Sequence, residues 1–339
     1  MKEYYGCNWI EKAHLNFNGQ ITDEWLVALC CENINDADGK RIIPSIPLHS
    51  GDGGGIIKCF MEMRKSVIEN GHHGCKDCVQ YQKKQWRENE QIHYVNLSMY
   101  PSPCQAKCVY CSLYGDDRLR FNDEIVKQGY ENIFDAVAYG LDSGTIHPNA
   151  FFQVSCGEIA IHPYKDRIFD LVKGRACAFF TNAFIYDEKI AHNLSSNPNS
   201  SINLSIDAGT PQTWLDVKGV DNFQQVVDNL IRYSNASHRP GQITLKYIIM
   251  PNVNTFAEDF IGVINIIKAL KIRGITLSRD VRIKYNHSSQ EQDELIVSAG
   301  YFAAMLQKSG VKWGMTQYSG KEQKDIVAFA KDALKTGQI

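Results

Sequence analysis

The chain has 339 residues, of which 44% are hydrophobic and 22% charged, and its formal net charge at pH 7 is -2. These values are typical of a globular protein with one or two domains. The small net charge argues against a nucleic-acid partner bound by phosphate neutralisation. No apolar run approaches the ~20 residues that span a bilayer, and the first residues do not resemble a secretory signal. We therefore expect a cytoplasmic protein with no membrane partner.

Cysteines are frequent and unevenly placed. The chain has eleven, and nine of them lie in the first 111 residues. In a reducing compartment, clustered cysteines are more often metal ligands or reactive thiols than disulfides. Residues 1–90 are therefore predicted to be a loop-rich, cysteine-bearing region, with one helix over 56–70 after a glycine-rich break at 50–55.

Short β-rich runs alternate with helical stretches from residue 93 onward. The alternation predicts right-handed crossovers and a parallel sheet. Strands are expected at 93–99, 150–155, 176–180, 202–206, 243–249 and 281–285, and helices at 122–139, 164–173, 222–234 and 257–273. With helices on one side only, we expect an α/β fold with a partial parallel (β/α)6-type barrel, whose chemistry lies at the carboxyl ends of the strands.

Three regions follow from this pattern: a cysteine-rich region over 1–90, a barrel core over 91–290, and an extension over 291–339. The extension has a helical pattern at 291–308, a strand pattern at 311–316 and a second helical pattern at 321–334. We expect this helix, strand and helix to complete or cover the barrel.

Three cysteines follow the first expected strand: Cys104, Cys108 and Cys111, in the spacing C-x3-C-x2-C. Thiolates are soft ligands that select iron–sulfur clusters and zinc. Three thiolates bind only three irons of a four-iron cluster, which leaves one iron open, and an open metal position is typical of a reactive site.

This triad resembles the signature of the radical S-adenosylmethionine (SAM) superfamily, and the aromatic Tyr110 before the third cysteine also matches. The resemblance covers residues 92–290. It implies a 4Fe-4S cluster whose open iron chelates the amino and carboxylate groups of SAM. It also implies a reductant such as flavodoxin or ferredoxin, reductive cleavage of SAM to a 5′-deoxyadenosyl radical, and hydrogen abstraction from a substrate. A zinc knuckle or three buried structural cysteines is the alternative.

Further motifs of that family have counterparts at later strand ends. Gly157 and Glu158 resemble the Gly-Gly-Glu motif that accepts the SAM ammonium group, although Cys156 replaces its first glycine. A thiol at Cys156 is a candidate hydrogen-atom donor to a substrate radical.

Three more strand ends carry the same resemblance. Asn182 matches a Thr-Asn-Gly motif, Ser205 a ribose-contacting serine, and Lys246 a basic residue that meets the SAM carboxylate. Asp207 corresponds to an acidic residue that points toward the active site, which makes it a catalytic candidate.

The remaining N-terminal cysteines resemble the auxiliary-cluster segments of the SPASM and twitch subfamilies. Those segments normally follow the barrel, whereas here they precede it, and the gap from Gly19 to Cys30 is longer than usual. Four thiolates suffice for a second 4Fe-4S cluster. Its expected ligands, with Cys31 and Cys59 as competitors, are the following four: Cys7, Cys30, Cys75 and Cys78. A structural zinc and ordinary buried thiols are the alternatives.

The expected function is a radical SAM oxidoreductase or isomerase that oxidises or epimerises a peptide side chain, a sugar or another small molecule. A second cluster would serve as its redox partner. The competing hypotheses are an iron–sulfur electron carrier and a zinc-binding module without catalysis.

Overall fold

The computed structural model describes most of the chain: residues 2–18, 26–30, 43–48, 52–76, 78, 80–87, 89–98, 102–111, 123–155, 157–272, 274–280, 289–337 and 339. These residues form two compact units. The first contains the described residues up to Cys104 together with 123–180, and the second contains 105–111 together with the described residues from Thr181 onward.

Six strands form the sheet of the first unit, in the order β4-β3-β2-β6-β7-β8. Strands β2, β6, β7 and β8 are parallel, and the short β3 and β4 run antiparallel at one edge. Their bounds are β2 His14–Asn18, β3 Leu26–Ala28, β4 Ser45–Pro47, β6 Ile92–Ser98, β7 Ile146–Val154 and β8 Cys177–Phe180.

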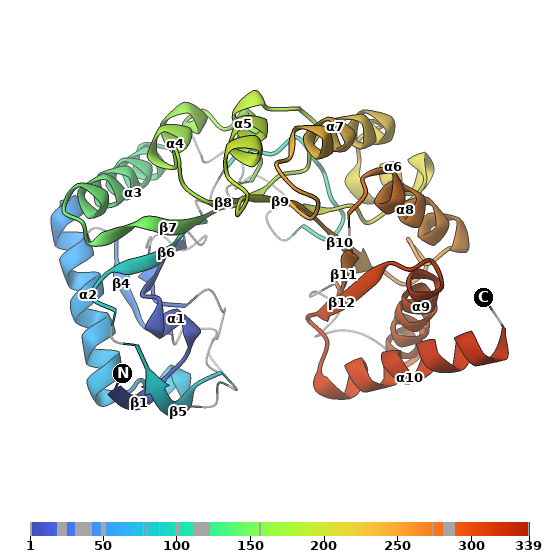
Figure 1. Ribbon diagram of the computed structural model, residues 1–339, viewed down its shortest axis with the longest axis horizontal. Coiled ribbons are helices and arrows are strands. Elements are labelled where there is room, and N and C mark those ends of the chain that lie inside the picture. Colours follow the sequence, from blue (N-terminus) through green and yellow to red (C-terminus); the bar gives the residue numbers. More distant parts are fainter. Residues whose placement is uncertain are drawn as a thin grey trace. The chain divides into compact units, whose positions relative to one another are not determined.

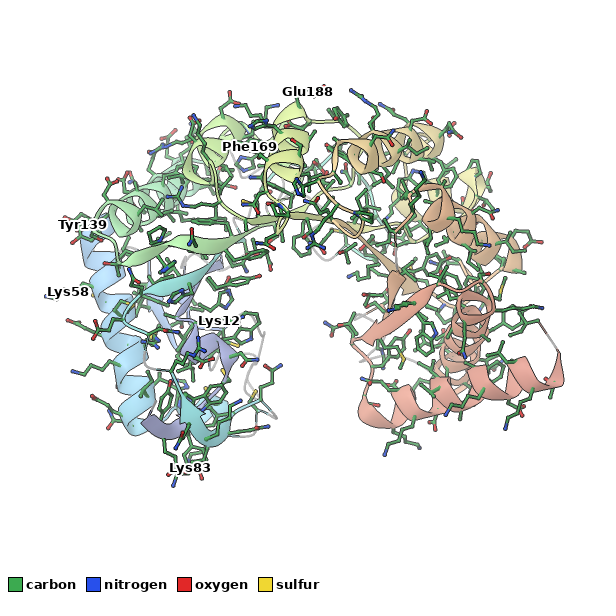
Figure 2. The ribbon with its side chains drawn as sticks, in the orientation of Figure 1. Lys12, Lys58, Lys83, Tyr139, Phe169 and Glu188 are labelled. Carbon is green, nitrogen blue, oxygen red and sulfur yellow. The ribbon has the colours of Figure 1, made fainter. Side chains whose placement is uncertain are left out.

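The longer helices of this unit pack on one side of its strands, whereas Trp9 of the short α1 contacts His14 and Tyr94. Helix α2 lies beside α3, and α3 contacts β7 (Figure 1). The helices are α1 Asn8–Glu11, α2 Gly53–Asn70, α3 Glu124–Asp142 and α4 Lys165–Leu171. Figure 2 labels Lys58 on α2 and Tyr139 on α3.

Helix α2 begins earlier than the sequence analysis expected, inside the glycine-rich stretch. The carboxylate of Asp52 accepts the backbone N–H of Gly55 at 2.8 Å and caps the helix. A Cβ at Gly53 would lie 2.4 Å from the carbonyl oxygen of Asp135 on α3. Glycine is therefore needed inside α2 because the two helix backbones approach each other closely there.

The N-terminal residues are more regular than predicted. Strand β2 pairs in parallel with β6, so residues before 90 join the main sheet of the unit. A separate two-stranded antiparallel sheet joins β1 Lys2–Gly6 to β5 Gln82–Trp86, in a region that was expected to be rich in loops. Long-range pairing decides these short strands, and local periodicity does not register it.

Four parallel strands form the sheet of the second unit, in the order β9-β10-β11-β12. Their bounds are β9 Ser201–Ser205, β10 Ile243–Ile249, β11 Gly274–Arg279 and β12 Lys312–Thr316. The helices are α5 Glu188–Ser196, α6 Pro211–Lys218, α7 Phe223–Ala236, α8 Ala257–Ala269, α9 Ser289–Lys308 and α10 Gly320–Thr336.

The predicted mostly parallel α/β architecture is confirmed, while the barrel is not. Neither sheet closes on itself in the part of the chain that the structure describes. The strand expected at 281–285 lies outside the described residues, and β11 occupies 274–279 instead. Strand β12 pairs with β11, so the C-terminal strand extends the sheet. None of the described helices is long and apolar enough to cross a membrane.

A close backbone contact joins the end of β9 to α8. The buried carboxylate of Asp259 accepts the N–H groups of Gly209 and Thr210 at 2.8 and 3.1 Å. A Cβ at Gly209 would lie 1.9 Å from the carbonyl oxygen of Asp259, and a Cβ at Gly262 would lie 2.0 Å from that of Gly209. Two glycines thus allow the helix to press against the turn after β9.

We expect Gly262→Ala to destabilise the protein by about 1–3 kcal/mol, because the added methyl group overpacks backbone against backbone. Chemical denaturation monitored by circular dichroism measures this. Gly314→Ala on β12 is the control, since a Cβ added there would have nothing within 4 Å. Equal stabilities of the two variants would contradict the contact.

Candidate functional site

The three cysteines of the triad lie on an irregular segment that follows β6 and links the two units. Cys104 belongs to the first unit, and Cys108 and Cys111 belong to the second; all three are half-buried. A turn closes the end of the segment, where the N–H of Cys111 donates to the carbonyl of Cys108 at 3.0 Å. The cysteines are thus presented by a loop at the carboxyl end of a strand, as predicted.

Helix α6 holds the second half of this loop through backbone hydrogen bonds. The N–H groups of Lys107 and Val109 donate to the carbonyls of Lys218 and Val217 at 2.8 and 3.0 Å. Gly219 then turns the chain at φ +67°, and a Cβ there would lie 2.8 Å from the Cβ of Lys107. Backbone hydrogen bonds to the last turn of α6 therefore fix the conformation of this half of the loop.

Side chains reinforce the same contact through a buried ion pair. The Nζ of Lys218 lies 2.6 Å from Oδ2 of Asp207 and 2.6 Å from the hydroxyl of Tyr110, and it donates to the carbonyl of Ser205 at 2.8 Å. These three partners use all three ammonium hydrogens. The hydroxyl of Tyr110 in turn donates to Oδ2 of Asp207 at 2.6 Å.

Both carboxylate oxygens of Asp207 accept hydrogen bonds within this network. It is 0% exposed and adopts a left-handed backbone conformation at φ +46°. Its Oδ1 accepts the N–H of Ile248 at 2.7 Å, and its carbonyl accepts the side-chain amide of Asn254 at 2.8 Å. Both carboxylate oxygens are occupied, so the observed contacts give Asp207 a positioning role. A direct catalytic role for Asp207 stays a prediction.

Burial also shapes the acid–base properties of Tyr110. Desolvation, followed by the nearby charge of Asp207 and of Cys108, raises the pKa of its phenol well above the usual range. The residue next to the third cysteine is therefore a neutral hydrogen-bonding anchor at physiological pH. Lys218 is a buried member of this network that the sequence analysis missed, because nothing in its local pattern distinguishes it from an exposed lysine at a helix end.

In the first unit, the strand end after β7 supports the start of the cysteine loop. Gly157 has φ +54°, and a Cβ there would lie 2.3 Å from Oγ of Ser102 and 2.5 Å from the carbonyl oxygen of Pro103. The N–H of Glu158 donates to that same carbonyl at 2.9 Å. Position 157 thus requires glycine, because the cysteine loop runs too close to it to leave room for a side chain. Cys156 lies outside the described residues.

Glu158 is fully buried, and its Oε1 accepts the N–H of Ala160 at 3.0 Å. It therefore caps the short 3-10 turn Ile159–Ile161. Its predicted role as acceptor for the SAM ammonium group is not tested by this contact and stays a prediction.

Polar atoms without partners accompany the cysteine loop on both sides of Cys104. The hydroxyl of Ser102 and both amide atoms of Gln105 are buried, with no hydrogen-bond partner among the described residues. Buried polar groups are normally satisfied by protein, water or a ligand. Ser102 in the first unit and Gln105 in the second therefore leave hydrogen-bonding capacity at positions close to Cys104 in the sequence.

The second unit brings two of the predicted SAM contacts onto one face. Ser205 on β9 and Lys246 on β10 are register partners on parallel strands, so their side chains point to the same side. Desolvation lowers the pKa of Lys246, and the nearby Lys218 lowers it further while Asp207 opposes this. Asn182, after β8, accepts the N–H of Phe184 at 2.9 Å through Oδ1 and so forms a turn.

Four N-terminal cysteines surround one small pocket in the first unit. Its lining includes the four predicted auxiliary ligands: Cys7, Cys30, Cys75 and Cys78. The pairing of Gly6 with Gln82 brings Cys7, directly after β1, near the segment that leads into β5. Cys30 follows β3, where its carbonyl accepts the side-chain amide of Asn16 at 2.9 Å.

The proximity of these thiols shows in their acid–base behaviour. Burial raises the pKa of Cys75 to about 11, and the charges of Cys7 and Cys78 contribute to the rise. The pKa of Cys7 is also raised by burial, although the N–H groups of Ile10 and Trp9 donate to its sulfur and oppose the shift. Burial thus disfavours the charged thiolate form of Cys7 and Cys75.

The competing ligands are not part of this pocket's described lining. Cys59 lies on α2, and Cys31 is outside the described residues. Within the described ranges, no three His, Cys, Asp or Glu side chains are arranged to hold one metal ion.

One protein family matches the part of the chain that contains the cysteine loop. Residues 102–267, which begin at the cysteine loop and include the strand ends described above, match the radical SAM superfamily. This stretch of the chain is similar to the radical SAM superfamily. The matched residues include the triad, Glu158, Asp207, Lys218 and Lys246, whereas the N-terminal cysteines lie outside them.

Solved structures give only distant likenesses. The chain is similar to Streptococcus suis SuiB bound to S-adenosylmethionine, with 12% identity, coverage of 79% of this chain and 57% of that chain, and a TM-score of 0.47. A radical SAM methyltransferase from Sphaerobacter thermophilus has 11% identity, coverage of 65% and 64%, and a TM-score of 0.39. The chain thus spans less than two thirds of the length of either structure. No curated protein matches.

We expect Lys218→Met to lower the free energy of unfolding by about 3–5 kcal/mol, because it leaves the carboxylate of Asp207 buried without its cation. Lys268→Met, at an exposed position in the last turn of α8, is the matched control and should change stability by less than about 0.5 kcal/mol. Urea denaturation followed by tryptophan fluorescence measures both. Equal effects would contradict the structural importance of the pair.

His162 should make the protein acid-sensitive. Its Nδ1 accepts the N–H of Tyr164, so Nε2 carries the hydrogen and donates to the hydroxyl of Tyr130. Burial lowers its pKa to about 4. As pH falls from about 6.5 toward 4, the unfolded chain gains a proton that the folded chain refuses, and stability declines.

The His162→Asn variant should therefore lose less stability than the wild type over that pH interval, with a difference of up to about 3 kcal/mol. Denaturation at a series of pH values measures the two slopes. His192→Asn, at an exposed position on α5, is the control. A wild-type slope in His162→Asn would overturn the assignment.

Proposed function

We propose that this chain is a radical SAM enzyme that reductively cleaves SAM and abstracts hydrogen from its substrate, with a second four-iron cluster as redox partner. The observation that carries the proposal is the triad of Cys104, Cys108 and Cys111 inside the matched stretch. Its loop is held by Gly157 and Glu158 in one unit and by α6 in the other.

Different residues of the matched stretch would bind the cluster and SAM. Cys104, Cys108 and Cys111 would ligate three irons, which leaves the fourth open to SAM. When bound, the cluster supplies the electron that splits SAM into methionine and a 5′-deoxyadenosyl radical.

The chain's own groups bind and orient the cofactor. Glu158 and the backbone at Gly157 would receive the SAM ammonium group, and Lys246 its carboxylate. Ser205 would meet the ribose, with Asn182 at the neighbouring strand end. Tyr110 would keep the loop in register through its bonds to Asp207 and Lys218.

Cys7, Cys30, Cys75 and Cys78 would hold the second cluster. Four thiols that line one pocket, two of them with raised pKa values, are suited to a cationic group. On a four-iron cluster each thiolate binds a different iron, so the sulfurs stand farther apart than four ligands around one zinc ion. A single zinc ion held by the same four thiols is the alternative.

A fully ligated second cluster suits chemistry that removes or returns an electron. Oxidation of the substrate, or a redox-managed epimerisation, is therefore the proposed reaction class. The substrate would be a sugar, another small molecule or a peptide side chain, and a flavodoxin or ferredoxin would supply electrons. Because Cys59 lies on α2 and outside the pocket's described lining, we propose no ligand role for it.

Anaerobic iron analysis of the wild type and three variants tests this proposal. We expect ~8 iron per wild-type chain, ~4 after Cys104, Cys108 and Cys111 are changed to alanine, and ~4 after Cys75 and Cys78 are changed to alanine. The Cys59→Ala variant is the matched control and should keep ~8. Zinc in place of the second set of irons would refute the auxiliary cluster.

An assay of SAM cleavage distinguishes the proposed enzyme from an iron–sulfur electron carrier. After reduction with dithionite, wild type should release methionine and 5′-deoxyadenosine, and the triad variant should release neither. Full iron content without cleavage in wild type would exclude the proposed radical chemistry.

A further inference from the structure

A cavity of about 720 Å³ lies at the amino end of β6 in the first unit, where His93 and Tyr94 form part of its lining. We call it the amino-end cavity. The cysteine loop follows the carboxyl end of the same strand. Because β6 has seven residues, its two ends lie about 20 Å apart. The amino-end cavity is therefore separate from the candidate site at the cysteine loop.

The buried Arg64 of α2 fixes two segments of the cavity wall. Arg64 is only 6% exposed, and its guanidinium donates to the carbonyls of Ile10 and Asn89 at 2.7 and 2.8 Å. The side-chain amide of Asn89 in turn donates to the carbonyl of Glu11 at 2.8 Å. Asn89 and Glu11 both line the cavity. These bonds hold the end of α1 against the segment before β6, so the wall is ordered without a ligand.

The described lining of the cavity carries a net positive charge. Lys12 and Arg87 are both exposed, and neither has an ion-pair partner among the described residues. Glu11 is the carboxylate in this lining, and its Oε1 accepts the backbone N–H of Arg87 at 3.0 Å. Two cations with free donor groups thus accompany one carboxylate, which favours an anionic ligand.

His93 adds a hydrogen-bonding group to the cations. Its ring is half-buried and packs against that of His147 on β7, with 4.6 Å between the ring centroids. Burial lowers the pKa of His93, and repulsion from His147 and from Arg64 lowers it further. The neutral imidazole offers one N–H donor. The repulsion also indicates that positive charge acts on this part of the wall, and a bound anion would offset it.

Two aromatic rings supply the apolar part of the cavity. Tyr94 and Phe151 are half-buried, and their ring centroids lie 5.3 Å apart. Rings of this kind offer a flat apolar surface to a ligand. The cavity volume is within the range that holds a small organic molecule. The lining therefore suits an anion that has an organic part.

The donor set favours a phosphate group over a carboxylate. A phosphate monoester carries about two negative charges at neutral pH and offers three strong acceptor oxygens. A guanidinium such as that of Arg87 binds two of these oxygens side by side, and an ammonium such as that of Lys12 binds as a point charge. His93 can donate to the third oxygen. A carboxylate has one charge and fewer oxygens for the same donors.

We propose that the amino-end cavity binds a phosphate monoester of a small aromatic or heterocyclic molecule. Its phosphate lies at Lys12, Arg87 and His93, and its ring lies against Tyr94 and Phe151. The site stands on these residues and does not rest on the proposed radical chemistry. Because the cysteine loop lies at the other end of β6, this ligand is distinct from SAM.

Isothermal titration of the full chain at pH 7 and low salt tests the site. The probes are phenyl phosphate, inorganic phosphate, benzoate and phenol. We expect saturable binding of phenyl phosphate, weaker binding of inorganic phosphate and of benzoate, and no binding of phenol. The affinity for phenyl phosphate should fall as salt is added, because Lys12 and Arg87 are exposed charges.

Removal of either cation should weaken binding of phenyl phosphate. We expect about a tenfold loss of affinity in Lys12→Gln and in Arg87→Gln, because each loses a hydrogen bond to a charged group. Both positions are exposed, so the fold should persist, which circular dichroism checks. Lys83→Gln on β5 removes the same charge outside the described lining and is the matched control; Figure 2 labels Lys12 and Lys83.

The Glu11→Gln variant should have the opposite effect. Its amide oxygen can still accept the N–H of Arg87, while the negative charge is lost. We expect about threefold tighter binding of phenyl phosphate. A general loss of stability would not produce tighter binding.

The site would be overturned by any of three results: no saturable binding of phenyl phosphate, binding of phenol or benzoate as tight as that of phenyl phosphate, or wild-type affinity in both Lys12→Gln and Arg87→Gln. Weaker binding in Glu11→Gln would overturn it too. The variant with alanine at Cys104, Cys108 and Cys111 should bind phenyl phosphate as wild type does, and loss of binding there would reject the position of the site. Binding by a chain that holds no iron and cleaves no SAM would reject the proposed function and support this site.

Discussion

The buried ion pair between Lys218 and Asp207 is the interaction on which the candidate site of the second unit depends. It joins the end of α6 to the end of β9 and reaches the cysteine loop through Tyr110. The cost of desolvating two charges is offset because every ammonium hydrogen and both carboxylate oxygens have partners. The ion pair holds the end of α6 in place, and the backbone hydrogen bonds from Lys107 and Val109 to α6 depend on that position.

Glycines perform the complementary task of letting backbones approach. Gly157 admits the start of the cysteine loop, Gly219 admits Lys107, and Gly209 and Gly262 admit each other's elements. Each contact occurs where a strand end or a loop meets another segment, which is where the candidate site is built. Such backbone contacts fix the position of the cysteine loop, because loops otherwise have few fixed partners.

The first unit combines two kinds of environment on one sheet. One face, which includes Leu15 and Val95, is apolar, and its burial stabilises the unit. The opposite face carries the buried ring nitrogens of His14, which have no hydrogen-bond partner among the described residues, and the amides of Asn16 and Asn96, which bond to each other. The N-terminal cysteines adjoin this face because β1 pairs with β5 and β2 pairs with β6. An N-terminal segment outside the matched residues is thereby continuous with β6, the strand that precedes the cysteine loop.

The sequence by itself determined the spacing of the triad at 104, 108 and 111 and the parallel α/β alternation from β6 to β10. These features follow from local spacing and periodicity, which a single segment contains. Only the tertiary structure decided that Lys218 partners Asp207, that β2 joins β6, and that β11 lies at 274–279. Those outcomes depend on segments from 11 to 80 residues apart, and pairing between distant segments leaves no mark on the periodicity of either one.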